Sequence, residues 1–297
     1  MRVAPRAGFV HPEGMTTTEP AVLPATLRLG AVHLTVTDLD RSVAFYQDSL
    51  GLRAHRRDDG VAALGAGEDD LVVLHEEPGA RPAGRHAGLY HFALLYPSRE
   101  ELARAVQRLA LTRTAISGAS DHGVSEAIYL PDPDGNGIEL YADRPRDAWP
   151  PASPGGRVGM FTRALDLDGL LATVAGDEPP RHAGPGLCMG HVHLHVGDLA
   201  ATRDFYVGVL GFEEMTTYPG ALFLSAGGYH HHVGLNTWRG EGVGPAPDGT
   251  VGLREWTIML DADALAALRA RLAAGGLGDG DVAADPSGNR LRITASS

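Results

Sequence analysis

Three side chains in this sequence are of the types that could together bind a metal ion. Glu139 lies in the strand-like run GIELY, where the two-residue period of a strand places it on one face with Tyr141. A carboxylate among apolar neighbours is costly unless a cation or hydrogen bonds compensate its charge. His91 opens the run HFALL, and His191 opens HVHLHV. Two neutral imidazoles and one carboxylate on one face would form a site for Fe(II) or Mn(II), with positions left open for a substrate and O2.

Each of these residues also has a simpler explanation. Glu139 could project into solvent from an edge strand, and a lone histidine such as His91 lies more often in a core or on a surface than on a metal. His193 shares a strand face with His191. We expect His193 to be structural or to support its neighbours, because it recurs as His33 beside an alanine and no carboxylate. His191 is therefore the candidate ligand.

Three consecutive histidines form a second feature that could do chemistry. They could be a solvated run, but strand alternation separates them: His231 shares a face with Val233 and Leu235, and His230 and His232 point the other way. We expect the histidine on the apolar face, His231, to line the interior. A histidine near the metal could serve as an acid–base group near neutral pH.

An internal repeat indicates which elements position these residues. Residues 30–52 align without a gap on residues 190–212, and eleven of the 23 positions are identical. A weaker echo links the motif DPDGNGIEL to DPSGNRLRI. Packing explains why shared residues recur.

The two copies differ where chemistry is expected. Ala31 stands where the second copy has His191, and Arg292 stands where the first copy has Glu139. Packing does not explain these differences, so function should be sought there.

Hydrophobic periodicity and turn residues predict four β-α-β-β-β units, two in each half of the chain. Asp38 is the expected N-cap of the first helix, which Gly51 ends. The units begin near residues 29, 90, 191 and 254. The predicted strands are 29–37, 52–57, 61–66, 70–75, 90–96, 113–117, 125–131 and 137–142, and the predicted helices are 38–50, 98–109 and 261–274.

The expected domain organisation follows from these units. We expect a flexible N-terminal arm (1–26), a first half (27–142), a surface linker with a short helical stretch (143–187) and a second half (188–297). The Gly/Pro-rich loop 239–252 is long enough to be functional rather than a mere connector.

Composition excludes several classes of function. The 297 residues carry a formal net charge of −12, which argues against partners such as nucleic acid or an anionic membrane surface. A single cysteine excludes an intramolecular disulfide and fits a reducing compartment. No stretch has the length and apolarity of a signal peptide or a transmembrane helix, so we expect a cytoplasmic protein. The sequence leaves both a monomer and a homo-oligomer open.

These motifs resemble those of a known family. The repeat HVHLHVGDL…FY…LGF with DPDGNGIELY is similar to the vicinal oxygen chelate (glyoxalase/bleomycin resistance/dioxygenase) superfamily, and more narrowly to type I extradiol catechol 2,3-dioxygenases. The resemblance covers roughly residues 28–295, apart from the linker. It implies an α+β fold in which the four βαβββ units form two paired-unit barrels. It also implies Fe(II), with Mn(II) as an alternative, and a role in the breakdown of aromatic compounds, with a catechol-type diol and O2 as substrates.

The resemblance also implies roles for particular residues. The family's metal ligands match His91, His191 and Glu139. Its proton-transfer histidine matches His231 in the run HHVGL, and its substrate-orienting His and Tyr match His122 in HGV and Tyr129, ten residues before Glu139. His232 and Trp238 are the expected substrate contacts.

The sequence departs from the family in one respect. The usual enzymes take this set from the C-terminal half, whereas here it comes from the second and third units. The set is complete only if unit two pairs with unit three, which leaves units one and four as a metal-free pair.

Two alternatives remain open. A glyoxalase-type isomerase or lyase would need a fourth ligand, commonly a second Glu, and the matching part of unit three offers histidines instead. A non-catalytic binding protein of the same fold would bind no metal.

Overall fold

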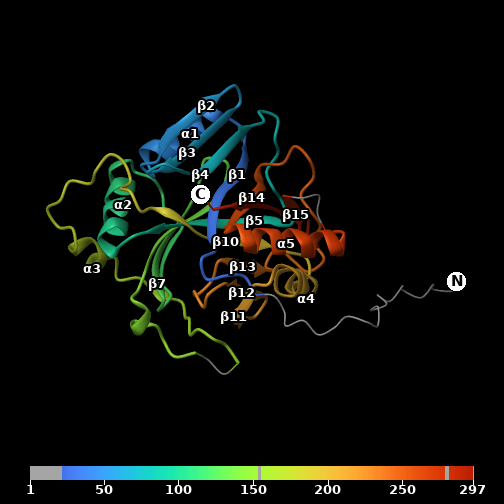
Figure 1. Cartoon of the computed structure of the whole chain (residues 1–297). Helices are drawn as coiled ribbons and strands as arrows, with labels where there is room; N and C mark the ends of the chain where they lie inside the picture. The colour runs from blue at the N-terminus through green and yellow to red at the C-terminus, as the bar shows by residue number, and fades with distance from the viewer. Residues whose placement is uncertain (1–21, 153–154, 278–280, 297) are drawn as a thin grey trace.

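The computed structural model describes residues 22–152, 155–277 and 281–296, which form two mixed β-sheets and the helices that pack against them (Figure 1). The first sheet has the strand order β15 (Val282–Ala284), β16 (Arg290–Ala295), β14 (Gly252–Leu260), β1 (Arg28–Val36), β4 (Asp69–Glu76), β3 (Val61–Ala66) and β2 (Arg53–Asp58).

The second sheet holds the three candidate metal ligands. Its strand order is β11 (Glu213–Tyr218), β12 (Ala221–Ser225), β13 (Val233–Asn236), β10 (Cys188–His195), β5 (Gly88–Tyr96), β8 (Gly137–Asp143), β7 (Ser125–Pro131), β6 (Gly118–Asp121) and β9 (Arg163–Ala164).

Aspartate side chains cap the first turns of helices in both halves of the chain. The carboxylates of Asp38 and Asp198 accept hydrogen bonds from backbone N–H groups of the first turn, as predicted for Asp38. No helix among the described residues is long and apolar enough to cross a membrane. The helices are α1 (Leu39–Asp48), α2 (Arg99–Leu111), η1 (Arg146–Ala148), α3 (Leu167–Ala172), α4 (Leu199–Arg203), the π-helical η2 (Asp204–Leu210) and α5 (Ala262–Gly275).

The units pair across the two halves of the chain. Strand β10 of unit three is antiparallel to β5 of unit two, and β1 of unit one is antiparallel to β14 of unit four. The pairing predicted from the distribution of ligands is therefore confirmed, and each sheet combines one unit from each half. In the fourth unit the described residues form two strands after the helix rather than three.

Three local expectations differ from the structure. The strand predicted at 113–117 is wrong, because Thr114 N donates to Leu109 O and closes the end of α2; the strand begins at Gly118 instead. The segment 143–187 is not purely a surface linker, because it contributes β9 to a sheet edge and buries Leu170. Residues 1–21 of the expected arm (1–26) lie outside the described residues. Leu23, which belongs to the rest of that arm, is buried.

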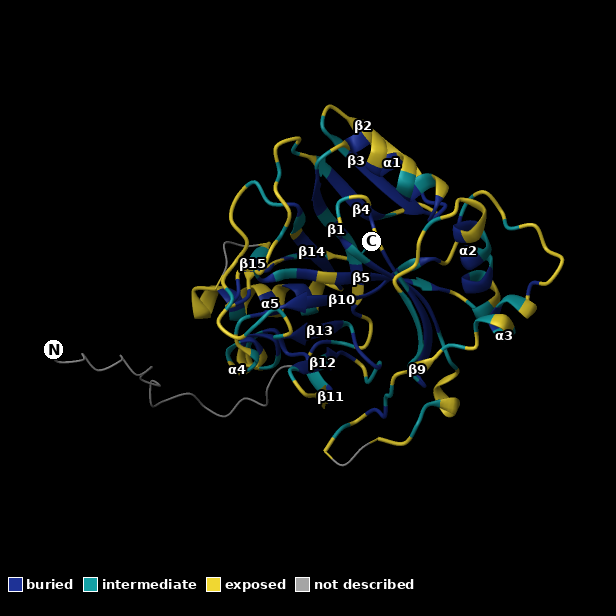
Figure 2. Cartoon of the chain, turned by 180° about the vertical axis from the view of Figure 1, so that it is seen from behind, coloured by how far each residue is buried: buried dark blue, intermediate teal, exposed yellow. Residues whose placement is uncertain are grey.

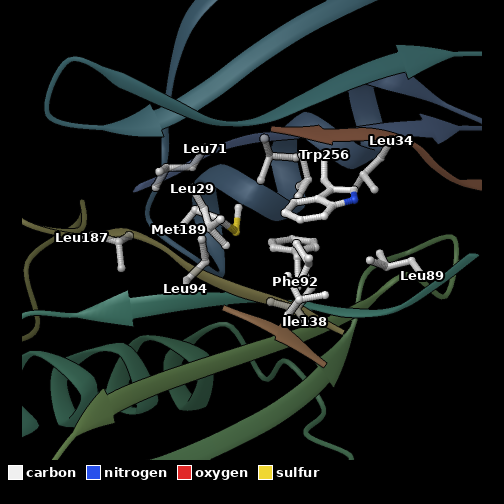
Figure 3. Packing of buried hydrophobic residues seen from close by; sticks show 14 of the residues in the cluster. Leu29, Leu34, Leu71, Leu89, Phe92, Leu94, Ile138, Leu187, Met189 and Trp256 are labelled. Atoms are coloured by element: carbon white, nitrogen blue, oxygen red, sulfur yellow. The ribbon is translucent and has the colours of Figure 1, made fainter. Parts of the chain in front are cut away.

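The apolar faces of the two sheets pack against each other. Trp256 of β14, Phe92 of β5 and Ile138 of β8 meet in this layer, and all three are at most 1% exposed (Figure 3). Most strands are buried, apart from β2 and β9 at the sheet edges, whereas the outer faces of helices such as α1 and α5 are exposed to solvent (Figure 2). The polar residues of the candidate site therefore project from the opposite face of the second sheet.

A duplicated polar contact explains why two separate motifs recur together. Tyr46 of α1 donates to the carboxylate of Asp132 at 3.1 Å, and Tyr206 of η2 donates to Asp285 at 3.4 Å. Each aspartate also accepts backbone N–H bonds within its own DPxGN turn. The tyrosine of each FY motif therefore links the helix of one unit to the DPxGN turn of the next unit by a hydrogen bond to its aspartate.

Removing the Tyr46 hydroxyl should destabilise the fold. In Tyr46→Phe the buried Asp132 carboxylate loses one donor, and we expect a loss of about 1–3 kcal/mol in the free energy of unfolding, measured by urea denaturation. The longer bond of Tyr206 predicts a smaller loss for Tyr206→Phe. A larger loss for Tyr206→Phe would contradict this account.

Candidate metal centre

The candidate ligands are brought together by the alignment of three neighbouring strands at Ala93. In β5, alternation places His91 and Ala93 on the same face. Glu139 of β8 lies opposite Ala93 on one side, and His191 of β10 lies opposite Ala93 on the other. Because alanine leaves space above its methyl group, the three longer side chains can converge over it.

The ligand atoms have the spacing that a metal ion requires. Oε2 of Glu139 lies 3.0 Å from Nε2 of His91 and 3.1 Å from Nε2 of His191. The candidate ligand atoms of the group all lie within 4.8 Å of one another, and all three residues are buried. Two ligands about 2.1 Å from a metal and at right angles to each other are about 3 Å apart. The contact of His91 Nε2 with Glu139 lacks hydrogen-bond geometry, so this buried nitrogen has no hydrogen-bond partner among the described residues and is available to a cation.

The electrostatics of the triad favour the forms that bind metals. Burial lowers the pKa of His191 to about 4, which leaves its imidazole neutral at pH 7. Burial of Glu139 opposes ionisation, but the facing His191 and His91 hold the pKa of its carboxyl well below the usual range. Neutral imidazole and ionised carboxylate are the forms that coordinate metal ions.

The corresponding positions of the first sheet carry an ion pair. The register that sets His193 opposite His91 sets His33 opposite Glu255, so Glu255 occupies the position of His91. Arg292 donates to both oxygens of Glu255, at 2.6 and 3.1 Å. Across the described residues, the triad of the second sheet is the one group of three such side chains with metal-binding spacing.

His231 lies beside the triad at the end of a chain of hydrogen bonds. Its ring centroid is 4.0 Å from that of His191. Nε2 of the buried His230 donates to Asp143 at 2.9 Å, and Nδ1 of His230 is 2.8 Å from Nδ1 of His231. In a neutral His230 the second nitrogen is an acceptor, so Nδ1 of His231 is the donor. Nε2 of His231 is then left as an acceptor beside the cavity.

Tyr129 and His122 form a second hydrogen-bonded pair near the triad. Nδ1 of His122 donates to the carbonyl of Phe161 at 3.0 Å, which makes Nε2 the acceptor for the Tyr129 hydroxyl at 2.7 Å. Tyr129 lies opposite Glu139 across β7 and β8, and its ring is 5.7 Å from that of His91. The structure thus brings both residues to the cavity that contains the triad.

A cavity of about 1080 Å³ opens over His91 and Glu139 of the triad, and its other lining residues include His231, Tyr129 and His122. His191 and His230 are not among its described lining residues. Trp238 also lines it, with 52% of its surface exposed. His232 is not among the described residues that line it, since Nδ1 of His232 is 2.8 Å from the Ser225 hydroxyl. We therefore withdraw His232 as a substrate contact.

The expected strand face of His231 is also corrected. The three histidines precede β13, which begins at Val233, so strand alternation does not govern them. Val233 and Leu235 lie in the hydrophobic core, not in the cavity wall. His231 reaches the cavity because the chain turns before the strand.

His193 lines the cavity, on the strand face that it was expected to share with His191. Its buried Nε2 has no partner among the described residues, and its ring packs against Tyr90, Phe223 and Trp238. Gly234 lies opposite His193, where a Cβ would come within 2.8 Å of the His193 ring. Gly234 in the run HHVGL, which has no side chain to cover a histidine on a neighbouring strand, is the signal that could have indicated an open space beside His193.

Comparisons with known proteins agree with this geometry. The family model described as the glyoxalase/bleomycin resistance protein/dioxygenase superfamily matches residues 28–140 and 189–293. The chain is 47% identical over 237 residues to a protein of Bacillus subtilis (strain 168) named catechol-2,3-dioxygenase, covering 78% of this chain and 82% of that protein.

Solved structures share the fold at low sequence identity. A putative dioxygenase from Bacillus subtilis has a TM-score of 0.63 at 15% identity, covering 93% of this chain and 87% of its own. Glyoxalase I from Zea mays has a TM-score of 0.54 at 20% identity, covering 90% and 92%.

Filling the space above Ala93 should weaken metal binding without altering a ligand. Ala93→Leu would place a branched side chain between Glu139 and His191, and we expect divalent-metal affinity to fall more than about 10-fold. Isothermal titration with Fe(II) under nitrogen measures this. The matched control is Thr257→Leu, which crowds the equivalent position of the first sheet. Equal loss in both variants would contradict the role of Ala93.

Proposed function

The chain belongs to the glyoxalase/bleomycin resistance protein/dioxygenase superfamily, and we propose that it is an extradiol dioxygenase that opens a catechol-type ring with O2 at a non-haem Fe(II) centre. The observation that carries this proposal is the buried group of two histidines and one glutamate beside a large cavity. The relative named catechol-2,3-dioxygenase supports the same reaction class.

We assign the metal to His91, His191 and Glu139. The orphaned Nε2 of His91 and the 3.0–3.1 Å spacing fit a cation held by three ligands. Three protein ligands on one side leave the other positions open, as in two-histidine, one-carboxylate iron sites. When bound, the metal would provide a template for both diol oxygens and the electronic coupling between the ring and O2. The donor set also accepts Mn(II).

We assign proton transfer to His231. The contacts from Asp143 through His230 leave Nε2 of His231 without a proton, so it can take one from a diol hydroxyl and later return it. His230 is completely buried, which shields this chain of contacts from water. Asp143 and His230 are positioning residues that act through His231.

We assign orientation of the diol to Tyr129 and His122. The hydroxyl of Tyr129 lies in the cavity wall and is held by His122, whose ring is fixed by the carbonyl of Phe161. Because the Tyr129 hydroxyl donates its one hydrogen to His122, its oxygen can accept a hydrogen bond from a substrate hydroxyl and so orient the diol. Trp238 lines the same cavity and is the proposed aromatic contact for the ring.

A direct test is metal analysis of anaerobically purified protein, followed by O2 uptake with catechol. We expect one Fe per chain and one O2 consumed per catechol, with a yellow ring-opened product. A metal-loaded protein that consumes no O2 with any diol, but isomerises a hemithioacetal, would contradict the proposal in favour of a glyoxalase activity.

Replacing any proposed ligand should remove the metal. We expect His91→Ala, His191→Ala and Glu139→Ala to lose stoichiometric iron and ring cleavage, because two remaining ligands cannot hold the ion in a site built for three. Circular dichroism checks that the fold persists. The matched control is His33→Ala in the first sheet, which should keep both iron and activity; retained iron in the Glu139 variant would contradict the assignment.

His231 should be separable from the ligands. We expect His231→Gln to keep its iron and slow turnover by about 10²–10⁴-fold, the range for loss of a general acid–base group. His230→Phe, which keeps the ring but removes the contact to Asp143, should slow turnover less and also keep iron. Loss of iron from His231→Gln would instead make His231 a fourth ligand. Stopped-flow turnover and iron content measure these outcomes.

A further inference from the structure

The cavity over the triad contains one fixed positive charge. Of the described residues that line it, Arg239 is the single arginine, and no lysine is among them. Glu139 is the one carboxylate in the same wall, and it is engaged with the triad. The remaining wall is aromatic, apolar or neutral.

Arg239 has no counter-charge within the part of the chain that the structure describes. None of the ion pairs among these residues involves it, and its Nη1 donates to the carbonyl of His86 at 3.2 Å. Burial lowers the pKa of its guanidinium. A cation that is half-buried without an anion is unfavourable unless a ligand supplies the opposite charge.

The position of Arg239 is fixed before any ligand binds. Its backbone carbonyl accepts from Nε and Nη2 of Arg85, at 3.2 and 3.0 Å. With the bond from its Nη1 to His86, both ends of the residue are held by the segment that leads into β5. A guanidinium held in this way loses little side-chain freedom when it binds an anion.

A row of aromatic rings leads from the triad to Arg239. The ring of Tyr90 is 4.9 Å from that of His91 and 5.4 Å from that of Trp238, the residue before Arg239. Tyr90 is also 5.1 Å from His195, another wall residue. Tyr90, Trp238 and Arg239 line one cavity with His91 and Glu139, so an aromatic ligand bound beside the triad has both the aromatic rings and Arg239 available in the same cavity.

We propose that the substrate is an aromatic diol that carries a carboxylate on a short side chain, and that Arg239 binds this carboxylate. The inference rests on the proposed function and names its substrate class. A planar guanidinium fork matches a carboxylate, and its single positive charge balances one negative charge. A phosphate or sulfate ester is the less favoured source of an anion.

Arg239 also lines a second cavity, of about 910 Å³, against the first sheet. Arg290 lines that cavity and not the one over the triad. Arg290→Gln is therefore a matched control, because it removes an arginine from the second cavity alone. It separates a role of Arg239 at the triad from a role in the second cavity.

The test compares an acid with its uncharged amide. The probes are 3-(3,4-dihydroxyphenyl)propanoate and 3-(3,4-dihydroxyphenyl)propanamide, measured by O2 uptake with the iron-loaded enzyme. We expect kcat/KM to favour the acid by about 10- to 100-fold, the value of a charge-assisted hydrogen bond. In Arg239→Gln the ratio should fall to near one through KM, in Arg239→Lys it should be intermediate, and in Arg290→Gln it should persist.

A binding measurement makes the inference independent of turnover. Titration calorimetry with 3-phenylpropanoate and 3-phenylpropanamide, which have no hydroxyl groups to chelate a metal, should show the same preference and its loss in Arg239→Gln. No preference in the wild type, or a preference lost in Arg290→Gln and kept in Arg239→Gln, overturns the inference. Absence of O2 uptake with every diol, together with a retained preference in calorimetry, overturns the proposed function and not the role of Arg239.

Discussion

The site depends on the register of β10, β5 and β8 around Ala93. A slip of one residue in β8 would turn Glu139 to the opposite face and remove it from the triad. The other face of these strands holds that register, because Phe92 and Ile138 are buried against the first sheet (Figure 3). The apolar layer between the sheets therefore positions the polar site on the outer face, and its packing limits how far the ligands can move.

The two sheets differ in how the charge of a buried carboxylate is compensated. Each carries a buried carboxylate on the face away from the apolar layer, Glu139 in one and Glu255 in the other. A buried charge must be paired. Arg292 provides the counter-charge of Glu255. Glu139 instead faces His191, whose imidazole is kept neutral by burial, and His91, whose Nε2 has no hydrogen-bond partner among the described residues. The alanine in place of one histidine and the arginine in place of one glutamate thus account for metal-binding spacing in one of the two described sheets.

Much of this architecture could be predicted because its signals are local. The Asp38 cap and the alternation of the strands depend on residues that are adjacent in the sequence. The pairing of units two and three could be predicted because the candidate metal ligands occur in those two units. Contacts between distant segments could not be predicted in the same way. The strand β9 exists because it meets β6, and the orientation of His231 depends on a turn before β13 rather than on alternation. The cavity position of His193 likewise depends on Gly234, which lies on another strand.

One strand, β8, joins the triad to the residues proposed for proton transfer. Glu139, Tyr141 and Asp143 alternate along β8 and so share a face. The first faces the two histidines of the triad, and the last accepts from His230, which fixes the proton on His231. The Tyr141 hydroxyl lies 2.8 Å from the hydroxyl of Tyr229, which donates to the carboxylate of Asp143 at 3.2 Å. Because β8 is held in register on both sides, it fixes both Glu139 and Asp143, and the contact from Asp143 to His230 holds the turn that carries His231 beside the triad.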